Sequence, residues 1–176
     1  QKASIIAKVN SLQDKDIIDA LYKASKAGVK IKLNIRGICC LKTGTRNEAK
    51  NIEVISVIDY YLEHARIFQF YQGGDNLTFI SSADWMTRNL EKRIELMIPV
   101  IDTDIKIQLT DILEAAFQDN QQAHRIMEDG SSQRIQAKAK SAPFRMQEYL
   151  QKKASKLAKA RSYTRTTTFE PHKPSN

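Results

Sequence analysis

The sequence has few of the features that mark a membrane protein or a disulfide-stabilised secreted domain. No apolar run approaches the roughly 20 residues that a bilayer-spanning helix needs, and no signal-peptide pattern opens the chain. The two cysteines, Cys39 and Cys40, are neighbours, a spacing that suits neither a disulfide framework nor a zinc site. We therefore expect a protein of the reducing cytoplasm, with both thiols as small buried residues.

An excess of positive charge is confined to one end of the chain. The net charge is +8, yet residues 131–176 hold eleven Lys+Arg and two Asp+Glu, whereas residues 1–130 hold seventeen and eighteen. A neutral body argues against a polyanion-binding surface over the whole domain, so no specific nucleic-acid partner is expected. The basic end is either a solvated tail or a basic helix, with lysines at 152, 153, 156 and 159, that binds a polyanion or an anionic membrane.

The first 35 residues carry the pattern of a strand, a helix and a second strand. Residues 4–9 form a short apolar run, and residues 29–35 alternate apolar side chains with lysines. Between them, helically spaced apolar residues follow Asp14, a typical N-cap, and end at Gly28. Short links between such elements predict a right-handed βαβ unit and therefore a parallel sheet.

The following residues predict a mixed sheet with helices on its faces. The spacing of Ile55, Ile58 and Leu62 predicts a helix over 52–64. The remaining expected elements are a strand over 66–71, a turn over 72–76, a strand over 77–81, a polar turn over 81–89, a strand over 93–101 with Pro99 at a sheet edge or strand end, and a helix over 102–119 capped at Asp102 or Thr103.

The pattern weakens after about residue 128. Residues 128–144 are linker-like, 145–160 predict a basic helix, and 161–176 predict disorder. We therefore expect one domain over 1–128 and an appended basic tail over 129–176. Because the chain opens at Gln1 directly with strand-like residues, we expect it to be a fragment of a longer protein.

Arg36 is the first residue that could carry chemistry. It ends the second predicted strand, where open α/β sheets place their ligand sites, and the irregular stretch 36–51 begins there. A guanidinium at that edge presents a planar fork of donors that suits a phosphate. The alternative is a structural arginine paired with Glu48 or Glu63.

His64 is the second such residue, with Glu63 before it and Arg66 two positions after it. Imidazole titrates near neutral pH, so it can transfer a proton or attack a phosphorus atom. The alternative is a histidine that caps the end of the predicted helix. His124 and His172 have no comparable setting and are not counted as site residues.

The third place is the stretch 81–85, which follows a predicted strand. A hairpin would bring Asp84 close to His64, where its carboxylate could orient the imidazole. The alternative is a local turn or helix cap made by the serines. Lys8 and Asn10 end the first strand at the predicted ligand edge, so they could add contacts to a phosphate.

Three segments resemble the C-terminal catalytic domain of bacterial polyphosphate kinase, the second of its two phospholipase D-like domains. They are LNIRGICCL (33–41), NIEVISVIDYYLEHARIF (51–68) and FISSADWMTRNLEKRIEL (79–96). The resemblance covers roughly residues 1–128 in the family's order and spacing. It implies an α/β fold, a phospholipase D-like mixed sheet flanked by helices, here with a basic C-terminal extension.

The resemblance also implies an activity. Such enzymes transfer the terminal phosphate of ATP reversibly to polyphosphate through a phosphohistidine, and they require Mg²⁺. The family's nucleotide-binding arginine falls on Arg36 and its second active-site histidine on His64. The phosphorylated histidine and the magnesium ligands belong to the preceding domain, so we expect no metal ligand here and no turnover by this fragment. The implied partners are ATP or ADP, polyphosphate, the other domains of the polypeptide and further copies in a homo-oligomer.

Two departures from related patterns bear on these expectations. The phospholipase D pattern His-x-Lys-x4-Asp is met by His64 and Arg66, but Tyr71 stands where the acid would be. A self-contained phosphodiesterase is therefore the less favoured alternative. Within the kinase family, Ala-Lys-Asn at 49–51 replaces the usual Ser-Glu-Asn, so the 36–51 loop is expected to bind less typically.

Overall fold

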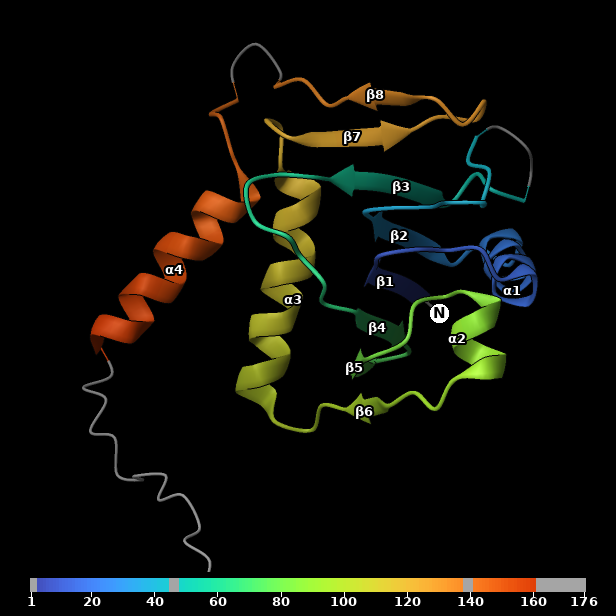
Figure 1. Cartoon of the computed structure of the whole chain (residues 1–176), viewed down its shortest axis with the longest axis horizontal. Helices are drawn as coiled ribbons and strands as arrows, with labels where there is room; N and C mark the ends of the chain where they lie inside the picture. The colour runs from blue at the N-terminus through green and yellow to red at the C-terminus, as the bar shows by residue number, and fades with distance from the viewer. Residues whose placement is uncertain (1–2, 45–47, 138–140, 161–176) are drawn as a thin grey trace, which may run out of the picture.

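An eight-stranded mixed sheet organises the protein in a computed structural model that describes residues 3–44, 48–137 and 141–160. The strands lie in the order β6-β5-β4-β1-β2-β3-β7-β8 (Figure 1). In chain order the elements are β1 (Ala3–Val9), α1 (Lys15–Lys26), β2 (Lys30–Ile35), β3 (Ile52–Val57), β4 (Ile67–Gln72), β5 (Asp75–Ser81), α2 (Thr87–Lys92), β6 (Met97–Pro99), α3 (Thr103–Gln118), β7 (Ala123–Ile126), β8 (Ser132–Arg134) and α4 (Met146–Ala160). The predicted mixed sheet flanked by helices is confirmed.

The predicted βαβ unit forms the centre of this sheet. β1 pairs with β2 in parallel, and β2 pairs with β3 in parallel. The Asp14 side chain caps α1 by accepting a hydrogen bond from the Ile17 N–H at 3.1 Å. After the helix, Gly28 takes a φ of +95°, a conformation that glycine adopts without steric cost.

Helices cover both faces of the central strands. Val54 and Ile55 are neighbours on β3 and both are fully buried, so they point to opposite faces. Val54 belongs to the cluster that α1 residues such as Leu21 join, whereas Ile55 packs in the cluster that includes Ala116 of α3. Figure 1 accordingly shows α1 and α2 on one side of the sheet and α3 and α4 on the other.

The helix predicted over 52–64 is wrong. Residues 52–57 form β3, and 58–66 follow as an irregular segment in which Ile58 is 65% exposed and Leu62 is 82% exposed. β3 has buried side chains on both faces, so its apolar residues do not alternate strictly, and their spacing is easily mistaken for that of a helix.

Smaller differences occur elsewhere. The strand predicted over 93–101 shrinks to β6, which lies at the sheet edge as Pro99 indicated. The region predicted to be a polar turn contains the start of the short helix α2, and the β7–β8 hairpin was not predicted. Cys39 is half-buried, but Cys40 is exposed, so the expectation of two buried thiols fails for Cys40.

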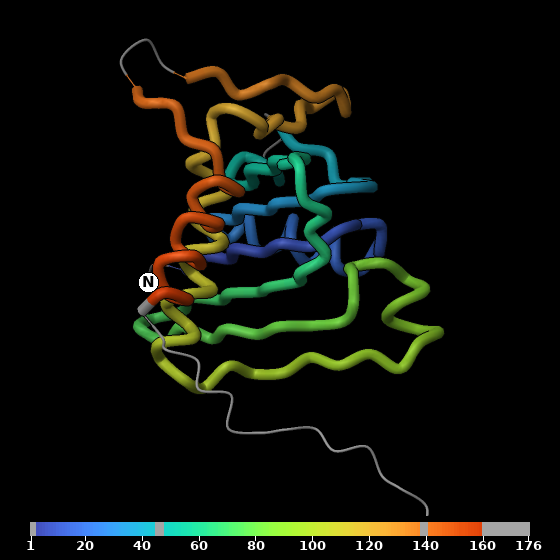
Figure 2. Tube along the Cα trace, turned by 60° about the vertical axis from the view of Figure 1, so that its left-hand side comes forward, coloured from blue at the N-terminus to red at the C-terminus, as the bar shows by residue number. Residues whose placement is uncertain are grey.

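The basic helix predicted over 145–160 is confirmed as α4, and it packs on the body of the protein. Met146 is fully buried in the cluster that contains Ile55, and Figure 2 shows α4 lying along α3. The boundary predicted near residue 128 falls within the hairpin that extends the sheet through β7 and β8. The disorder predicted for 161–176, and with it His172, lies outside the described residues.

Candidate active site

Several strand ends meet at one edge of the sheet, the edge formed by the carboxyl ends of its parallel strands. The parallel strands β1, β2 and β3 all end there; β4 is antiparallel to β1 and begins there, and β5 ends there. Because β1 and β2 separate β3 from β4, the segment 58–66 crosses the ends of these two strands (Figures 1 and 2). Arg36, His64, Arg66 and Asp84 therefore lie along the same edge.

Arg36 continues from β2, and its backbone turns closely around the end of β1. The N–H of Gly37 donates to the carbonyl of Asn10 at 2.7 Å, and a Cβ on Gly37 would lie only 2.9 Å from that oxygen. The side chain of Arg36 is half-buried, and its guanidinium makes no ion pair or hydrogen bond within residues 3–44, 48–137 and 141–160. The alternative pairing with Glu48 or Glu63 is not seen among these residues.

His64 lies in the irregular segment, and its side chain is exposed. Its backbone carbonyl accepts a hydrogen bond from Arg66 Nη1 at 3.1 Å. The imidazole has no hydrogen-bond partner in the described part of the chain. Since no helix precedes His64 here, the alternative that it caps a helix end is wrong, and its ring is available to an added group.

Arg66 and Asp84 form a two-point ion pair beside His64. Nε of Arg66 lies 3.2 Å from Oδ1 of Asp84, and Nη2 lies 2.8 Å from Oδ2. Oδ1 also accepts the backbone N–H groups of Asn10 at 2.7 Å and Ser11 at 3.3 Å. Burial acts to raise the pKa of Asp84, but the guanidinium and these N–H groups outweigh it and hold the pKa below its ordinary value.

The Asp84 carboxylate therefore contacts Arg66, and the expected contact with the His64 imidazole is not made. Its influence on His64 is indirect, because the Arg66 that it holds donates to the His64 carbonyl. The serine alternative is realised at Ser81, whose hydroxyl accepts the Ala83 N–H at 3.0 Å in a local turn.

Lys8 and Asn10 both lie at the site edge in a buried setting. Lys8 is 3% exposed, and its Nζ lies 3.2 Å from Oε2 of Glu63, so it neutralises the residue before His64. Asn10 is 5% exposed, and neither its amide nitrogen nor its amide oxygen has a hydrogen-bond partner among the described residues. Buried amide groups are normally paired, so the Asn10 side chain offers unused donors and an unused acceptor at this edge.

Two residues of the site were missed by sequence reasoning because they were assigned to the tail. Arg145 binds the carboxylate of Asp59, and Gln147 binds the backbone of Tyr61 and the carboxylate of Glu63. No local pattern indicates such contacts, since 86 positions separate Arg145 from Asp59.

The described residues contain no group of three or more His, Cys, Asp or Glu side chains placed to hold a metal ion. Magnesium prefers several oxygen ligands, and the Asp84 carboxylate at this edge is already bound to Arg66. The residues present therefore do not fit a magnesium site by themselves. None of the helices within these described residues is long and apolar enough to cross a membrane.

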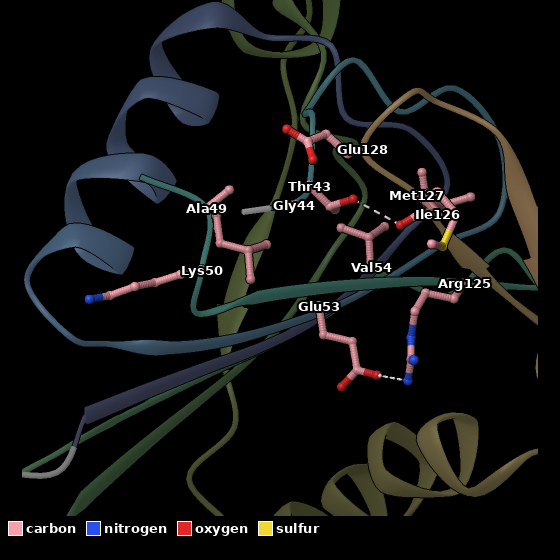
Figure 3. Close-up of a pocket in the computed structure, with 11 residues that line it drawn as sticks. Thr43, Gly44, Ala49, Lys50, Glu53, Val54, Arg125, Ile126, Met127 and Glu128 are labelled. Carbon is pink, nitrogen blue, oxygen red and sulfur yellow. Dashed lines mark hydrogen bonds and ion pairs between the residues drawn. The ribbon is translucent and has the colours of Figure 1, made fainter. Parts of the chain in front are cut away.

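A cavity of about 380 Å³ lies at the opposite end of β3 (Figure 3). The 36–51 loop forms part of its wall, where the Thr43 hydroxyl donates to the Ile126 carbonyl at 2.8 Å. Arg125 in this wall is paired with Glu53 at 2.9 Å, so its charge is already offset. This cavity is separate from the edge that holds the candidate active site.

The family model for polyphosphate kinase C-terminal domain 2 matches residues 1–147. A polyphosphate kinase of Rhodopirellula baltica is 50% identical over 174 residues, which are 99% of this chain and 20% of that protein. One of Halalkalibacterium halodurans is 47% identical over 143 residues, 81% of this chain and again 20% of that protein. The chain thus spans about a fifth of the length of the curated relatives that it matches.

Solved structures show the same relationship. The polyphosphate kinase of Porphyromonas gingivalis superimposes with a TM-score of 0.86 at 40% identity, over 92% of this chain and 24% of that one. Nuc of Salmonella typhimurium, a phospholipase D family member, gives a TM-score of 0.55 at 17% identity over 72% of this chain and 83% of its own. NucT of Helicobacter pylori gives 0.52 at 15% identity over 65% and 79%. The last two show the fold alone.

Proposed function

The chain belongs to the polyphosphate kinase family as C-terminal domain 2, and from this premise we propose that it supplies one half of a site that transfers the terminal phosphate of ATP reversibly to polyphosphate. One observation carries the proposal. An arginine with no partner among the described residues and an exposed histidine lie at the edge where three parallel strands end. Open α/β sheets bind their ligands at this edge.

In this proposal Arg36 binds phosphate oxygens of ATP or of polyphosphate. Phosphoryl transfer depends mainly on positioning and on stabilising charge around the moving phosphate. A guanidinium that no described carboxylate neutralises keeps its full charge and its fork of donors for that purpose. Asn10, whose side-chain amide has no hydrogen-bond partner among the described residues, is proposed to act from the neighbouring strand end.

His64 is proposed to face the transferred phosphate as an acid, a base or a ligand. The nucleophilic histidine that becomes phosphorylated, and the magnesium ligands, are proposed to lie in another domain of the full polypeptide. Bound Mg²⁺ would offset phosphate charge there, while the residues of this chain bind and orient the phosphate. The fragment alone is therefore expected to bind phosphates without turning over, and robust ATP-dependent polyphosphate synthesis by the fragment would refute the half-site.

The alternative of a polyanion-binding tail is weakened by the packing of α4. Lys153 pairs with Asp111 at 2.7 Å, and Lys152 approaches Glu148 at 3.9 Å, so two of the four lysines are partly neutralised. A phosphodiesterase is also not favoured, because the exposed Tyr71 occupies the position of the expected acid. Contact of the basic tail with a membrane surface is likewise proposed only as an alternative to the half-site.

Calorimetric titration of the chain with ATP and with short polyphosphate, at two salt concentrations, tests this function. Arg36→Ala is expected to weaken binding by about tenfold or more, because hydrogen bonds to charged groups contribute about 1.5–3 kcal/mol each. Lys23→Ala is the matched control, since Lys23 is an exposed cation in the last turn of α1. A chain that ends at residue 160 tests the basic end without removing α4 from the core.

The outcomes distinguish specific phosphate binding by Arg36 from general electrostatic attraction. Binding that survives truncation at residue 160 and falls in Arg36→Ala, but not in Lys23→Ala, supports the half-site. Equal losses in the two substitutions, or losses that vanish at high salt, would mean that general electrostatics account for the binding.

A further inference from the structure

The first turn of α4 holds the segment that carries His64. The Oε1 atom of Gln147 accepts the Tyr61 N–H at 2.8 Å, and its Nε2 donates to the Tyr61 carbonyl at 2.9 Å. The same Nε2 donates to Oε1 of Glu63 at 2.9 Å. Gln147 is only 6% exposed, so one buried amide satisfies both backbone groups of Tyr61 and one oxygen of Glu63.

Arg145 adds a second attachment directly before α4. Its Nε and Nη2 bind the two carboxylate oxygens of Asp59, with Nε at 2.9 Å from Oδ2. Its guanidinium also lies over the Tyr60 ring, 4.2 Å from the ring centroid. Residues 59–63 are therefore held at both ends by the beginning of α4.

The part of α4 that contacts residues 59–63 is itself bound to α3 and to Asp119, which directly follows α3. The backbone N–H of Met146, between Arg145 and Gln147, donates to Oδ2 of Asp119 at 2.8 Å, and Asp119 is 1% exposed. Further along α4, Tyr149 and Lys153 bind the two oxygens of Asp111 at 2.8 and 2.7 Å. α4 is thus attached both to α3 and to the irregular segment.

The segment depends on such support because it has no helix or strand of its own between β3 and β4. Glu63 completes the chain of contacts, since its second oxygen binds the buried Lys8 of β1. Gln147 and Lys8 together fix the residue that precedes His64. A reacting group displaced by about 1 Å can lose about a hundredfold in rate.

We propose that Gln147 is a positioning residue for His64, acting through the backbone of Tyr61 and the carboxylate of Glu63. This inference rests on the proposed function, in which His64 faces the transferred phosphate. Gln147 binds Tyr61 and Glu63, and its effect on transfer comes from holding the segment in one place. The beginning of α4 thereby helps to form the proposed site.

The test uses the full-length polyphosphate kinase that contains this chain. Gln147→Leu keeps the approximate size of the side chain and removes every hydrogen bond, and Gln147→Glu keeps an acceptor for the Tyr61 N–H but brings a carboxylate against Glu63. Both variants are expected to lower kcat for ATP-dependent polyphosphate synthesis about tenfold to a hundredfold, with a smaller change in KM for ATP. Gln151→Leu, at an exposed position one turn further along α4, is the control and is expected to keep wild-type kcat.

A double-mutant cycle separates positioning from general destabilisation. His64→Gln and Gln147→Leu are measured singly and together, by kcat and by the calorimetric affinity for ATP, on protein shown to be folded by its thermal transition. If Gln147 acts through His64, Gln147→Leu has little further effect once His64 is replaced. Additive losses, or wild-type kcat in Gln147→Leu, would overturn the inference. If His64→Gln alone leaves both quantities unchanged, the proposed role of His64 fails instead.

Discussion

Arg66 and Asp84 are joined by two hydrogen bonds, 3.2 Å from Nε to Oδ1 and 2.8 Å from Nη2 to Oδ2. The pair links the residue before β4 to the loop after β5, and Asp84 extends the link to the end of β1 through the Asn10 N–H. Three strand ends are thereby held in fixed relation. Arg66 occupies the position of the lysine in the phospholipase D pattern. Because its guanidinium is bound to Asp84, its role here is to hold the strand ends together.

Asp84→Ala is expected to lower the free energy of unfolding by about 3–5 kcal/mol, the usual cost of removing one partner of a buried ion pair. The side chains of Arg66 and Asp84 are 11% and 9% exposed, so the remaining guanidinium would be largely buried without a carboxylate, with only the His64 carbonyl as an acceptor. Urea unfolding with linear extrapolation measures the change. Asp19→Ala, which breaks the exposed pair with Lys15, is the control and should leave stability nearly unchanged. Equal effects of the two substitutions would contradict the structural role of Asp84.

The free energy of unfolding is expected to fall at acidic pH, in part because Asp84 becomes protonated. Its pKa in the folded protein lies below the ordinary value of about 3.9, so its contribution is present above that value and is lost as the pH falls through the folded pKa. Asp84→Asn should therefore be less stable at neutral pH and should lose less stability than wild type between about pH 4 and pH 2. Unfolding midpoints in urea over this range provide the measurement. Parallel pH curves for the two proteins would contradict the expectation.

Met146→Ala is expected to cost about 2–5 kcal/mol, as truncation of a buried methionine usually does. Met146 is 0% exposed and packs with residues of β3 and α3, although it lies beyond the predicted domain boundary. Leu157→Ala is the matched control, because Leu157 on the same helix is 45% exposed and should matter little. Chemical unfolding of both variants decides whether α4 belongs to the cooperative core. A negligible effect of Met146→Ala would show that it does not.

Gly37→Ala is expected to weaken ATP binding. The added Cβ would lie 2.9 Å from the carbonyl oxygen of Asn10, so the backbone beside Arg36 must shift to accommodate it. Overpacking of this kind typically costs about 1–3 kcal/mol. Calorimetric affinity for ATP, compared with the thermal midpoint of the same variant, measures both consequences. Unchanged affinity would show that Arg36 does not require the close turn at Gly37.

The elements that could be predicted are those determined by local interactions. The alternation of β2, the Asp14 and Asp102 caps and the turn between β4 and β5 all depend on residues close together in the chain. β3 was mistaken for a helix because helices on both sides of the sheet remove the alternation that marks an ordinary strand. Arg36 could be placed at the ligand edge because a strand end is itself a local feature.

By itself the sequence determined the βαβ unit, the family and the residues that stand at the strand ends, because each is written in short-range patterns and in recognisable segments. Only the tertiary structure decided that Arg66 neutralises Asp84 and that α4 holds the segment before His64. Such contacts join residues up to 86 positions apart, and they depend on which faces pack together. The sequence does not show which partner an arginine or a glutamine will bind, because only the packing of the core brings the two side chains within hydrogen-bonding distance.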